Sequence, residues 1–331
     1  MSGPGDGPAR AATADVAAVV IGRNEGARLV ACLRSLQGEA DRVVYVDSGS
    51  TDASVAAARA AGAEVVALDM SLPFTAARAR NAGLARIGAG GGACPPYVQF
   101  VDADCEMRPG WIAAARRFLD AHPRAAVASG RLRERHPEAS PWNRMIDAEW
   151  NTPVGRVRAC GGIAMMRTAP LLAAGGFDGD LIAGEEPELC LRLRAAGWEV
   201  WRLDEEMAWH DAAMRSWRQW WQRARRAGYA YAEGAAMHGR APERHCVPEL
   251  RRALLWGLAL PAVAFGGLLL TPWAGLLLLA FPLQVARLRA RGLPWRQALF
   301  LVLGKFPEVQ GAFTWAWRRL GRARPQLIEY K

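Results

Sequence analysis

Short apolar runs alternate with amphipathic or Ala-rich stretches along the first 120 residues. Each apolar run is followed at once by Gly or Asp, which predicts strands at 16–21, 42–46, 64–68 and 97–101. The stretches between and after them predict helices over 27–36, 53–61, 75–87 and 111–121. This alternation is typical of stacked βαβ units in an α/β protein. Strands this apolar are covered by helices on both faces, as parallel strands are.

Polar clusters follow three of the predicted strands, at Gly22–Glu25, Asp47–Asp52 and Asp102–Asp104. Ligands of open parallel sheets bind at the carboxyl ends of the strands. We therefore expect the three clusters to converge on one crevice. Asp102 and Asp104 would place two carboxylates there, and carboxylate oxygens are hard ligands suited to Mg²⁺ or Mn²⁺.

The pattern is less regular from residue 130 to residue 167, where 160–167 predicts a strand entered through two glycines. The segment 184–197 (GEEPELCLRLRAAG) has clear helix signals: acids at the start, Pro187 in the first turn and Gly197 as a stop. Glu185 and Glu186 then stand at the entrance of this helix.

Residues 253–286 carry no formal charge and are bounded on both sides by arginines. One continuous helix would be roughly 50 Å long, well beyond a hydrocarbon core of about 30 Å. Thr271-Pro272 interrupts the segment near its middle, so a hairpin of two short helices is expected. The Arg-rich flanks place both ends on the cytoplasmic side. The hairpin could span the bilayer or enter it shallowly, and a buried core hairpin is the alternative.

Two further segments are rich in Trp. Residues 293–320 alternate apolar and basic groups, which predicts an interface-lying helix. In the helix predicted over 216–226, Trp217, Trp220 and Trp221 share a face that fits either the protein core or a membrane interface.

The formal net charge of +10 is unevenly distributed. Residues 251–331 hold 12 basic and 2 acidic residues, so residues 1–250 are neutral overall. A uniformly basic nucleic-acid-binding enzyme is thereby disfavoured, and an anionic membrane is the expected partner.

The six cysteines form no C-x-x-C pair, which indicates a reducing compartment. The polar tail 1–14 is expected to be flexible, and the apolar run after it is too short for a signal peptide.

Six motifs in order resemble the family 2 glycosyltransferases of the GT-A fold, which is Rossmann-like. They are AVVIGRNEGARLVACLRSL, VVYVDSGSTDAS, ARARNAGL, VQFVDADCEM, GGFD and GEEPELCLRL, with His210 following them. The resemblance covers roughly residues 15–245 and does not specify the acceptor. It implies a glycosyltransferase domain at 15–245, with 246–331 as a helical membrane-associated region.

The resemblance also implies roles for individual residues. Donor-binding residues would be Asn24, Glu25, Asp47, Arg80, Asn81 and Asp102. A divalent cation, Mg²⁺ or Mn²⁺, would be held by Asp102, Asp104 and His210, and would neutralise the departing nucleoside diphosphate. Inverting transfer needs a general base, and Glu186 occupies the family's catalytic acidic position. A helix N-terminus favours the charged form of such a carboxylate, while Glu185 or Glu188 could serve instead.

The sequence therefore predicts a metal-dependent, inverting glycosyltransferase at the inner membrane, with its catalytic domain in the cytoplasm. Its acceptor would be a glycan or a lipid-linked molecule. Two other functions remain open. A sugar nucleotidyltransferase would usually have a basic Gly-rich loop where this chain has GRNEG, and it would release pyrophosphate. A membrane-binding scaffold without activity is disfavoured by the presence of Asp102, Asp104 and Glu186.

Overall fold

A computed structural model describes residues 16–89, 94–321 and 328. The predicted flexible tail at 1–14 lies outside the described residues. Contacts divide the chain into two compact units: residues 1–135, 147–179 and 185–212 form the first, and residues 136–146, 180–184 and 213–331 form the second. The division into domains at 245/246 stays a prediction.

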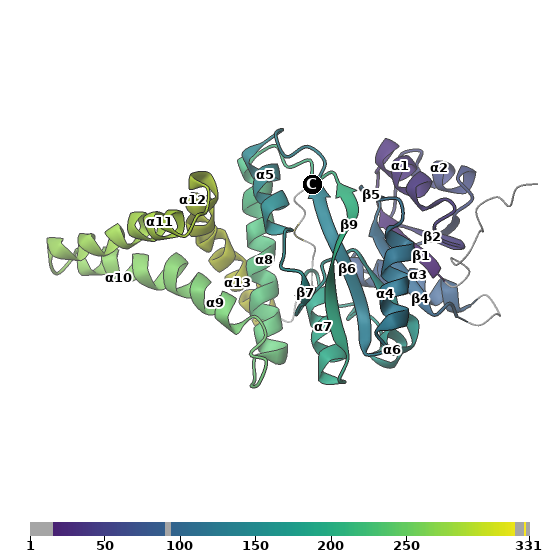
Figure 1. Cartoon of the computed structure of the whole chain (residues 1–331). Coiled ribbons are helices and arrows are strands. Elements are labelled where there is room, and N and C mark those ends of the chain that lie inside the picture. Colours follow the sequence, from purple (N-terminus) through teal and green to yellow (C-terminus); the bar gives the residue numbers. More distant parts are fainter. Residues whose placement is uncertain (1–15, 90–93, 322–327, 329–331) are drawn as a thin grey trace, which may run out of the picture. The chain divides into compact units, whose positions relative to one another are not determined.

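The first unit is built on a sheet of order β3-β2-β1-β4-β8-β6-β9-β5, with β7 paired to β9 (Figure 1). Strands β3, β2, β1 and β4 lie side by side in that order and are all parallel. Strand β8 runs antiparallel to β4 and β6. The strands are β1 (Val16–Gly22), β2 (Arg42–Asp47), β3 (Glu64–Ala67), β4 (Tyr97–Asp102), β5 (Cys105–Met107), β6 (Ala125–Glu134), β7 (Gly155–Arg156), β8 (Ala164–Arg167) and β9 (Glu199–His210).

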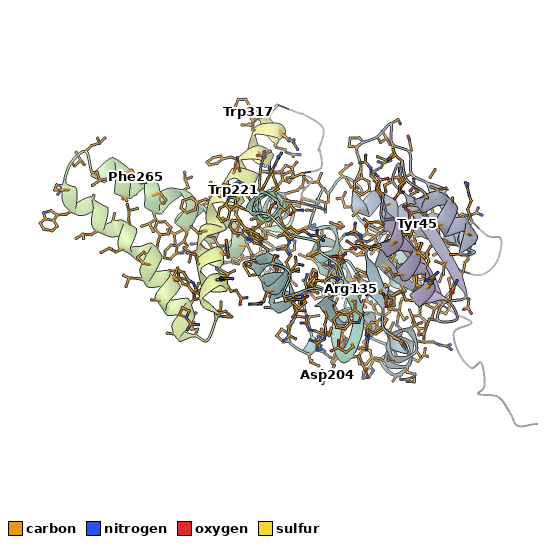
Figure 2. All side chains as sticks on the ribbon, turned by 90° about the horizontal axis from the view of Figure 1, so that it is seen from above. Tyr45, Arg135, Asp204, Trp221, Phe265 and Trp317 are labelled. Carbon is orange, nitrogen blue, oxygen red and sulfur yellow. The ribbon has the colours of Figure 1, made fainter. Side chains whose placement is uncertain are left out.

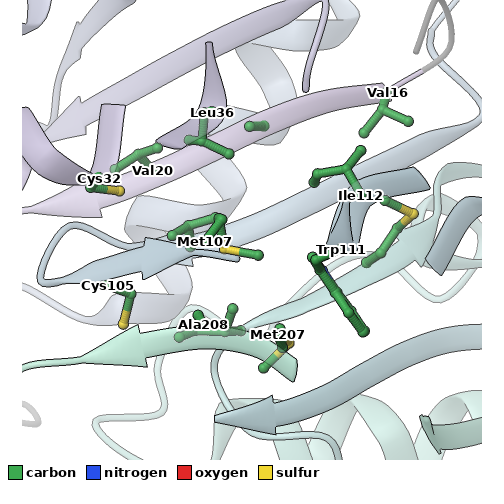
Figure 3. Packing of buried hydrophobic residues seen from close by; sticks show 14 of the residues in the cluster. Val16, Val20, Cys32, Leu36, Cys105, Met107, Trp111, Ile112, Met207 and Ala208 are labelled. Atoms are coloured by element: carbon green, nitrogen blue, oxygen red, sulfur yellow. The ribbon is translucent and has the colours of Figure 1, made fainter. Parts of the chain in front are cut away.

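Helices cover both faces of this sheet, as predicted. Alternate residues of β1 enter two separate apolar clusters: Val16, Ala18 and Val20 pack with α1 and α4 (Figure 3), while Ala17, Val19 and Ile21 pack with α3 and α7. The helices of this unit are α1 (Ala27–Leu36), α2 (Ser54–Ala60), α3 (Ala76–Gly88), α4 (Trp111–Ala121), α6 (Thr168–Ala173) and α7 (Glu185–Ala195). The predicted α/β class is confirmed.

One predicted strand is shorter than expected. The strand predicted over 160–167 begins only at Ala164, as β8. Gly161 has φ +81°, a left-handed conformation that interrupts an extended strand. Residues 160–162 are therefore a loop, and this loop enters the candidate site described below.

The second unit is helical. Its elements are α8 (Trp217–His238), α9 (Val247–Leu254), η1 (Leu255–Ala259), α10 (Leu260–Gly267), η2 (Pro272–Leu279), α11 (Ala280–Ala290), α12 (Trp295–Leu303) and α13 (Lys305–Leu320), while α5 (Pro141–Glu149) contributes residues to both units. The helical run 247–267 and the run 272–290 form the predicted hairpin (Figure 1). The Thr271 hydroxyl accepts a hydrogen bond from the Trp273 amide at the start of the second arm.

The segment 293–320 is not the single helix that was expected, and its place at a membrane interface stays a prediction. Two helices, α12 and α13, are separated at Gly304, and α13 packs along α8. A Cβ on Gly311 would lie 1.9 Å from the Arg225 carbonyl oxygen, so glycine is what permits this close approach. One face of α13 therefore belongs to a protein core, although Trp317 on the same helix is 79% exposed.

The Trp stripe of α8 also lies partly in the core. Trp220 is buried, and its ring centroid lies 5.0 Å from that of Phe300 in α12. The Trp217 ring lies tilted against those of Trp220 and Phe300, with centroids 4.6 and 5.9 Å away, but it remains 44% exposed. Core packing is thus the correct interpretation for Trp220.

The hairpin exposes large apolar side chains, including Phe265 (Figure 2). Leu269 and Leu270 at its turn are 89% and 90% exposed, and Trp273 is 74% exposed. By length and composition, Pro272–Ala290 is the single helix among the described residues that could cross a membrane, and none of it is buried. This criterion alone is weak support for membrane association. The exposure of the hairpin contradicts the alternative of a buried core hairpin.

Candidate active site

The ends of β1, β2 and β4 are neighbours, as the strand pattern predicts. In the register of the sheet Gly22 pairs with Asp47, and Ile21 pairs with Asp102. Backbone hydrogen bonds extend both pairings, from the Ser48 amide to Gly22 and from the Ala103 amide to Ile21. Three polar segments distant in sequence are thereby brought to one edge of the sheet.

Asn24 and Asp47 organise the loops at this edge. Asn24 has φ +55°, and its side-chain oxygen accepts a hydrogen bond from the Thr51 amide at 2.7 Å. The Asp47 carboxylate accepts bonds from the amides of Gly49 and Ser50 and from the Tyr45 hydroxyl. Glu25, in the loop after β1, pairs with Arg28 at 2.7 Å. Asn24 thus ties the β1 loop to the β2 loop, while Asp47 orders the β2 loop itself.

Arg80 links two predicted site carboxylates. Its guanidinium, contributed by α3, lies 3.0 Å from Asp102 Oδ1 and 2.7 Å from Glu185 Oε1. Burial lowers the pKa of Arg80, but the charges of Asp102 and Glu185 raise it by more, so the pKa lies above its ordinary value. Gly162 leaves room for this network, since a Cβ there would lie 2.7 Å from Arg80 Nη2.

Asp104 and His210 also come together. His210 ends β9 and pairs with Cys105 of β5 on one side and Glu134 of β6 on the other. Its Nε2 lies 3.4 Å from Asp104 Oδ1, and its Nδ1 lies 3.9 Å from Glu134 Oε2. The buried Nδ1 makes no hydrogen bond within the described residues. Asp104, Cys105 and His210 each offer a ligand atom, and these atoms lie within 4.8 Å of one another.

Glu186 occupies a different environment from its neighbour Glu185. Its Oε1 accepts hydrogen bonds from the Cys160 amide and from the Cys190 thiol. Burial raises the pKa of Glu186, and these hydrogen bonds offset the rise only in part. Burial therefore acts against the charged form that the helix N-terminus was expected to favour.

The side chains of Asn81 and Glu188 form hydrogen bonds with other parts of the protein. Both polar atoms of the Asn81 amide bond to the Phe177 backbone, at 2.7 and 3.0 Å. Glu188 forms a bidentate pair with Arg192 one turn later in α7. Direct ligand contact by Asn81 stays a prediction. Both carboxylate oxygens of Glu188 accept hydrogen bonds from Arg192, which disfavours Glu188 as the general base.

Sequence reasoning missed three contributors: Glu134, Gly162 and Cys160. Glu134 is buried behind His210, and its Oε2 accepts a bond from the Ala212 amide. It lies in the part of the irregular region before residue 160, for which no strand is predicted. The sequence shows the paired glycines before β8, but nothing in it indicates that this loop contacts Arg80 and Glu186.

Taken together, this edge of the sheet can hold a phosphate-rich ligand and a hard cation. The nitrogen and oxygen donors of His210 and Asp104 suit Mg²⁺ or Mn²⁺. Burial raises the pKa of Glu186, which makes its carboxylate a stronger base than an ordinary glutamate and suits it to proton transfer. Neither of the glycine motifs that bind dinucleotides or form a P-loop follows β1, where the chain reads GRNEG.

Comparison with known proteins agrees with this arrangement. Residues 17–167 match the family model described as glycosyl transferase family 2. The mannosyltransferase PcManGT from Pyrobaculum calidifontis superimposes with a TM-score of 0.64 at 21% identity, over 93% of this chain and 89% of that one. A mycobacterial protein gives 0.50 at 18% identity, over 70% and 78%. Residues 17–167 therefore match glycosyl transferase family 2, and the chain has a fold similar to that of a mannosyltransferase.

Proposed function

We propose that the chain transfers a sugar, with inversion, from a nucleotide-sugar to an acceptor at the cytoplasmic face of a membrane, using Mg²⁺ or Mn²⁺. The observation that carries this proposal is the Asp102–Arg80–Glu185 network, centred on the buried Arg80, together with the Asp104–His210 pair. A guanidinium held between carboxylates is placed to bind a diphosphate that carries its own cation. The mannosyltransferase with the similar fold was solved with GDP-Man and Mn²⁺.

The residues present fit a divalent cation. His210 has a buried ring nitrogen without a hydrogen bond in the described part of the chain, and Asp104 places a carboxylate oxygen 3.4 Å from the other ring nitrogen. Asp104 and His210 would hold the cation, with Asp102 beside them. When bound, the cation would neutralise charge on the departing nucleoside diphosphate.

The nucleoside would lie against the β1 and β2 loops. Asp47 is buried at the end of β2, and its carboxylate has more acceptor positions than the three bonds it already makes. Asn24 and Glu25 lie beside it on the β1 loop. We assign these three residues to ribose and base contacts, and Arg80 to the diphosphate.

Glu186 is the proposed general base. Its hydrogen bonds in the described residues engage Oε1, which leaves Oε2 to accept the acceptor's hydroxyl proton. Its pKa is raised, so it is a stronger base than an ordinary glutamate. Glu185 is engaged with Arg80 and serves as a positioning residue.

The acceptor is proposed to be lipid-linked, because the second unit exposes an uncharged apolar hairpin flanked by arginines. Arg251 and Arg252 precede it, and Arg287, Arg289 and Arg291 follow it, all exposed. An exposed apolar surface of this kind marks an interaction site, and basic residues near an anionic leaflet add about 1 kcal/mol each.

The proposal can be tested by measuring thermal shifts of the full chain with UDP, GDP and their sugar conjugates, with and without Mn²⁺. A stabilising nucleotide should require the cation, and Asp104→Asn should abolish the cation dependence. Products of the stabilising donor are then analysed: release of a nucleoside diphosphate with an inverted anomer supports the proposal. Release of pyrophosphate would indicate a nucleotidyltransferase, and turnover unaffected by Glu186→Gln would overturn the assignment of the base.

A further inference from the structure

A second cluster of ligand-type side chains lies beside the proposed base. The thiols of Cys160 and Cys190 are 3.7 Å apart, and Cys190 Sγ lies 3.3 Å from Glu186 Oε1. Glu186 and Cys190 are four residues apart on α7 and so share one face of the helix. Cys160 reaches them from the loop before β8. The three ligand atoms lie within 4.8 Å of one another.

These distances match the edges of a metal tetrahedron. With zinc–sulfur bonds of about 2.3 Å, two thiolates on a tetrahedral Zn²⁺ lie about 3.8 Å apart, and a thiolate and a carboxylate oxygen lie about 3.6 Å apart. A disulfide requires sulfurs about 2.0 Å apart, which the thiols do not approach here. The cluster is thus spaced for a shared ion rather than for a covalent bond.

We propose that Cys160, Cys190 and Glu186 form a binding site for a thiophilic divalent cation such as Zn²⁺. Three protein ligands would leave a fourth position for water. Binding forms two metal–sulfur bonds and releases the two thiol protons to solvent. Thiolates select Zn²⁺ over the hard ions Mg²⁺ and Mn²⁺, so this site is chemically distinct from the Asp104–His210 pair.

The site would regulate transfer, an inference that rests on the proposed role of Glu186. Zn²⁺ bound at Glu186 Oε1 would withdraw electron density from the whole carboxylate, so Oε2 would become too weak a base to accept the acceptor's proton. Occupation of the site should therefore inhibit the enzyme even when Mg²⁺ is saturating. Removal of Zn²⁺ should restore activity.

Titration of the full chain with Co²⁺, under reducing conditions, tests the site without any assay of activity. Cobalt bound by thiolates gives an intense near-ultraviolet charge-transfer absorption, which we expect to saturate at one equivalent. Cys160→Ser should remove at least half of this absorption. Cys190 is fully buried, and serine there would place a hydroxyl in the core and could destabilise the fold, so Cys160, on a loop, carries the assignment.

Two matched variants provide controls. Cys105→Ser removes the thiol beside Asp104, so absorption that survives this change but is lost in Cys160→Ser belongs to the proposed site. Cys94→Ser should leave the titration unchanged. Cobalt bound without charge-transfer absorption, or absorption unchanged in Cys160→Ser, would overturn the proposal.

The activity measurement is kept separate. One equivalent of Zn²⁺ in excess Mg²⁺ should lower transfer at least tenfold, and Cys160→Ser should make the enzyme insensitive to Zn²⁺. A positive cobalt titration with no inhibition would retain the metal site and refute Glu186 as the base. A negative titration with normal transfer would refute the metal site alone.

Discussion

At the scale of single residues, Arg80 is the side chain on which the candidate site depends most. Its guanidinium is buried and neutralises Asp102 and Glu185 at the same time, which one ammonium group cannot do with the same geometry. We expect Arg80→Lys to lower kcat/KM for the donor at least tenfold and stability by about 2 kcal/mol. Steady-state kinetics and urea denaturation measure the two effects.

Arg86→Lys is the matched control, because Arg86 is exposed and pairs with Glu64 at the surface. Its stability should change by no more than about 0.5 kcal/mol, with kinetics unchanged. Equal kinetic losses in the two variants would show that Arg80 has no special role toward the donor.

The raised pKa of Glu186 predicts how the stability of the protein depends on pH. Burial raises its pKa above the ordinary 4.5, so the native state holds a proton that the unfolded state has already lost. Stability contributed by this group is therefore present below pH 4.5 and is lost as pH rises through the native pKa. As pH rises above 4.5, denaturation midpoints should fall less in Glu186→Gln than in the native chain.

The same group should set the acid limb of kcat/KM, with a midpoint above 4.5, because the protonated carboxyl cannot act as a base. Glu308 on α13 is the control: burial also raises its pKa, so Glu308→Gln should alter the pH dependence of stability and leave the acid limb in place. An acid limb that persists in residual activity of Glu186→Gln would contradict the assignment.

Individual residues also show where sequence reasoning ends. Strand-end polarity predicted that the segments holding Asn24, Asp47 and Asp102 end at one edge of the sheet, and the register of β1 with β2 and β4 agrees, because parallel strands align their carboxyl ends. It could not show that the Asn81 amide is occupied by the Phe177 backbone. The pairing of Cys160 with Cys190 depends on how a loop folds against α7, and no local spacing encodes that.

At the scale of elements, the contact of α8 with α13 depends on two glycines. Cβ atoms at Gly228 and Gly311 would each lie 1.9 Å from a backbone carbonyl oxygen of the other helix. We expect Gly311→Ala to push the helices apart and lower stability by about 1–3 kcal/mol, measured by urea denaturation.

Gly266→Ala in α10 serves as the comparison, since nothing lies within 4 Å of a Cβ there. It should be neutral or stabilising by up to about 1 kcal/mol. If Gly311→Ala proved as harmless as Gly266→Ala, the close packing of α8 and α13 would not contribute to stability.

The same contact explains which elements could be predicted. Helices α1 and α4 match their predicted bounds, because each has a single amphipathic face and a glycine near an end. Helix α8 continues twelve residues beyond the predicted Arg226, to His238, through two glycines that would normally weaken a helix. Packing against α13 outweighs that local preference, and local patterns do not reveal it.

At the scale of the whole molecule, charge and apolar exposure are segregated along the chain. The first 250 residues are neutral, while the hairpin is uncharged and flanked by exposed arginines. The sequence alone predicted this arrangement, since runs without charge need no tertiary information. It could not predict that Leu269, Leu270 and Trp273 remain exposed while residues of α13 are buried.

This segregation leads to a prediction about membrane binding. Leu269 and Leu270 are almost fully exposed, so Leu269→Glu with Leu270→Glu should leave the fold intact. Burial of each leucine in lipid is worth about 1.5–3 kcal/mol, so the double variant should bind vesicles at least a hundredfold more weakly. Cosedimentation of the full chain with vesicles of anionic and of neutral lipid measures the change.

Arg287→Gln with Arg289→Gln separates the electrostatic contribution from the apolar one. This variant should lose about 1 kcal/mol per residue on anionic vesicles, and the loss should disappear on neutral vesicles or at high salt, where charge attraction is absent or screened. Donor-induced thermal shifts should be the same in both double variants as in the native chain, because neither change touches the proposed donor site. If the leucine variant bound vesicles as well as the native chain, the hairpin would not be the membrane contact, and the preference for a lipid-linked acceptor would lose its support.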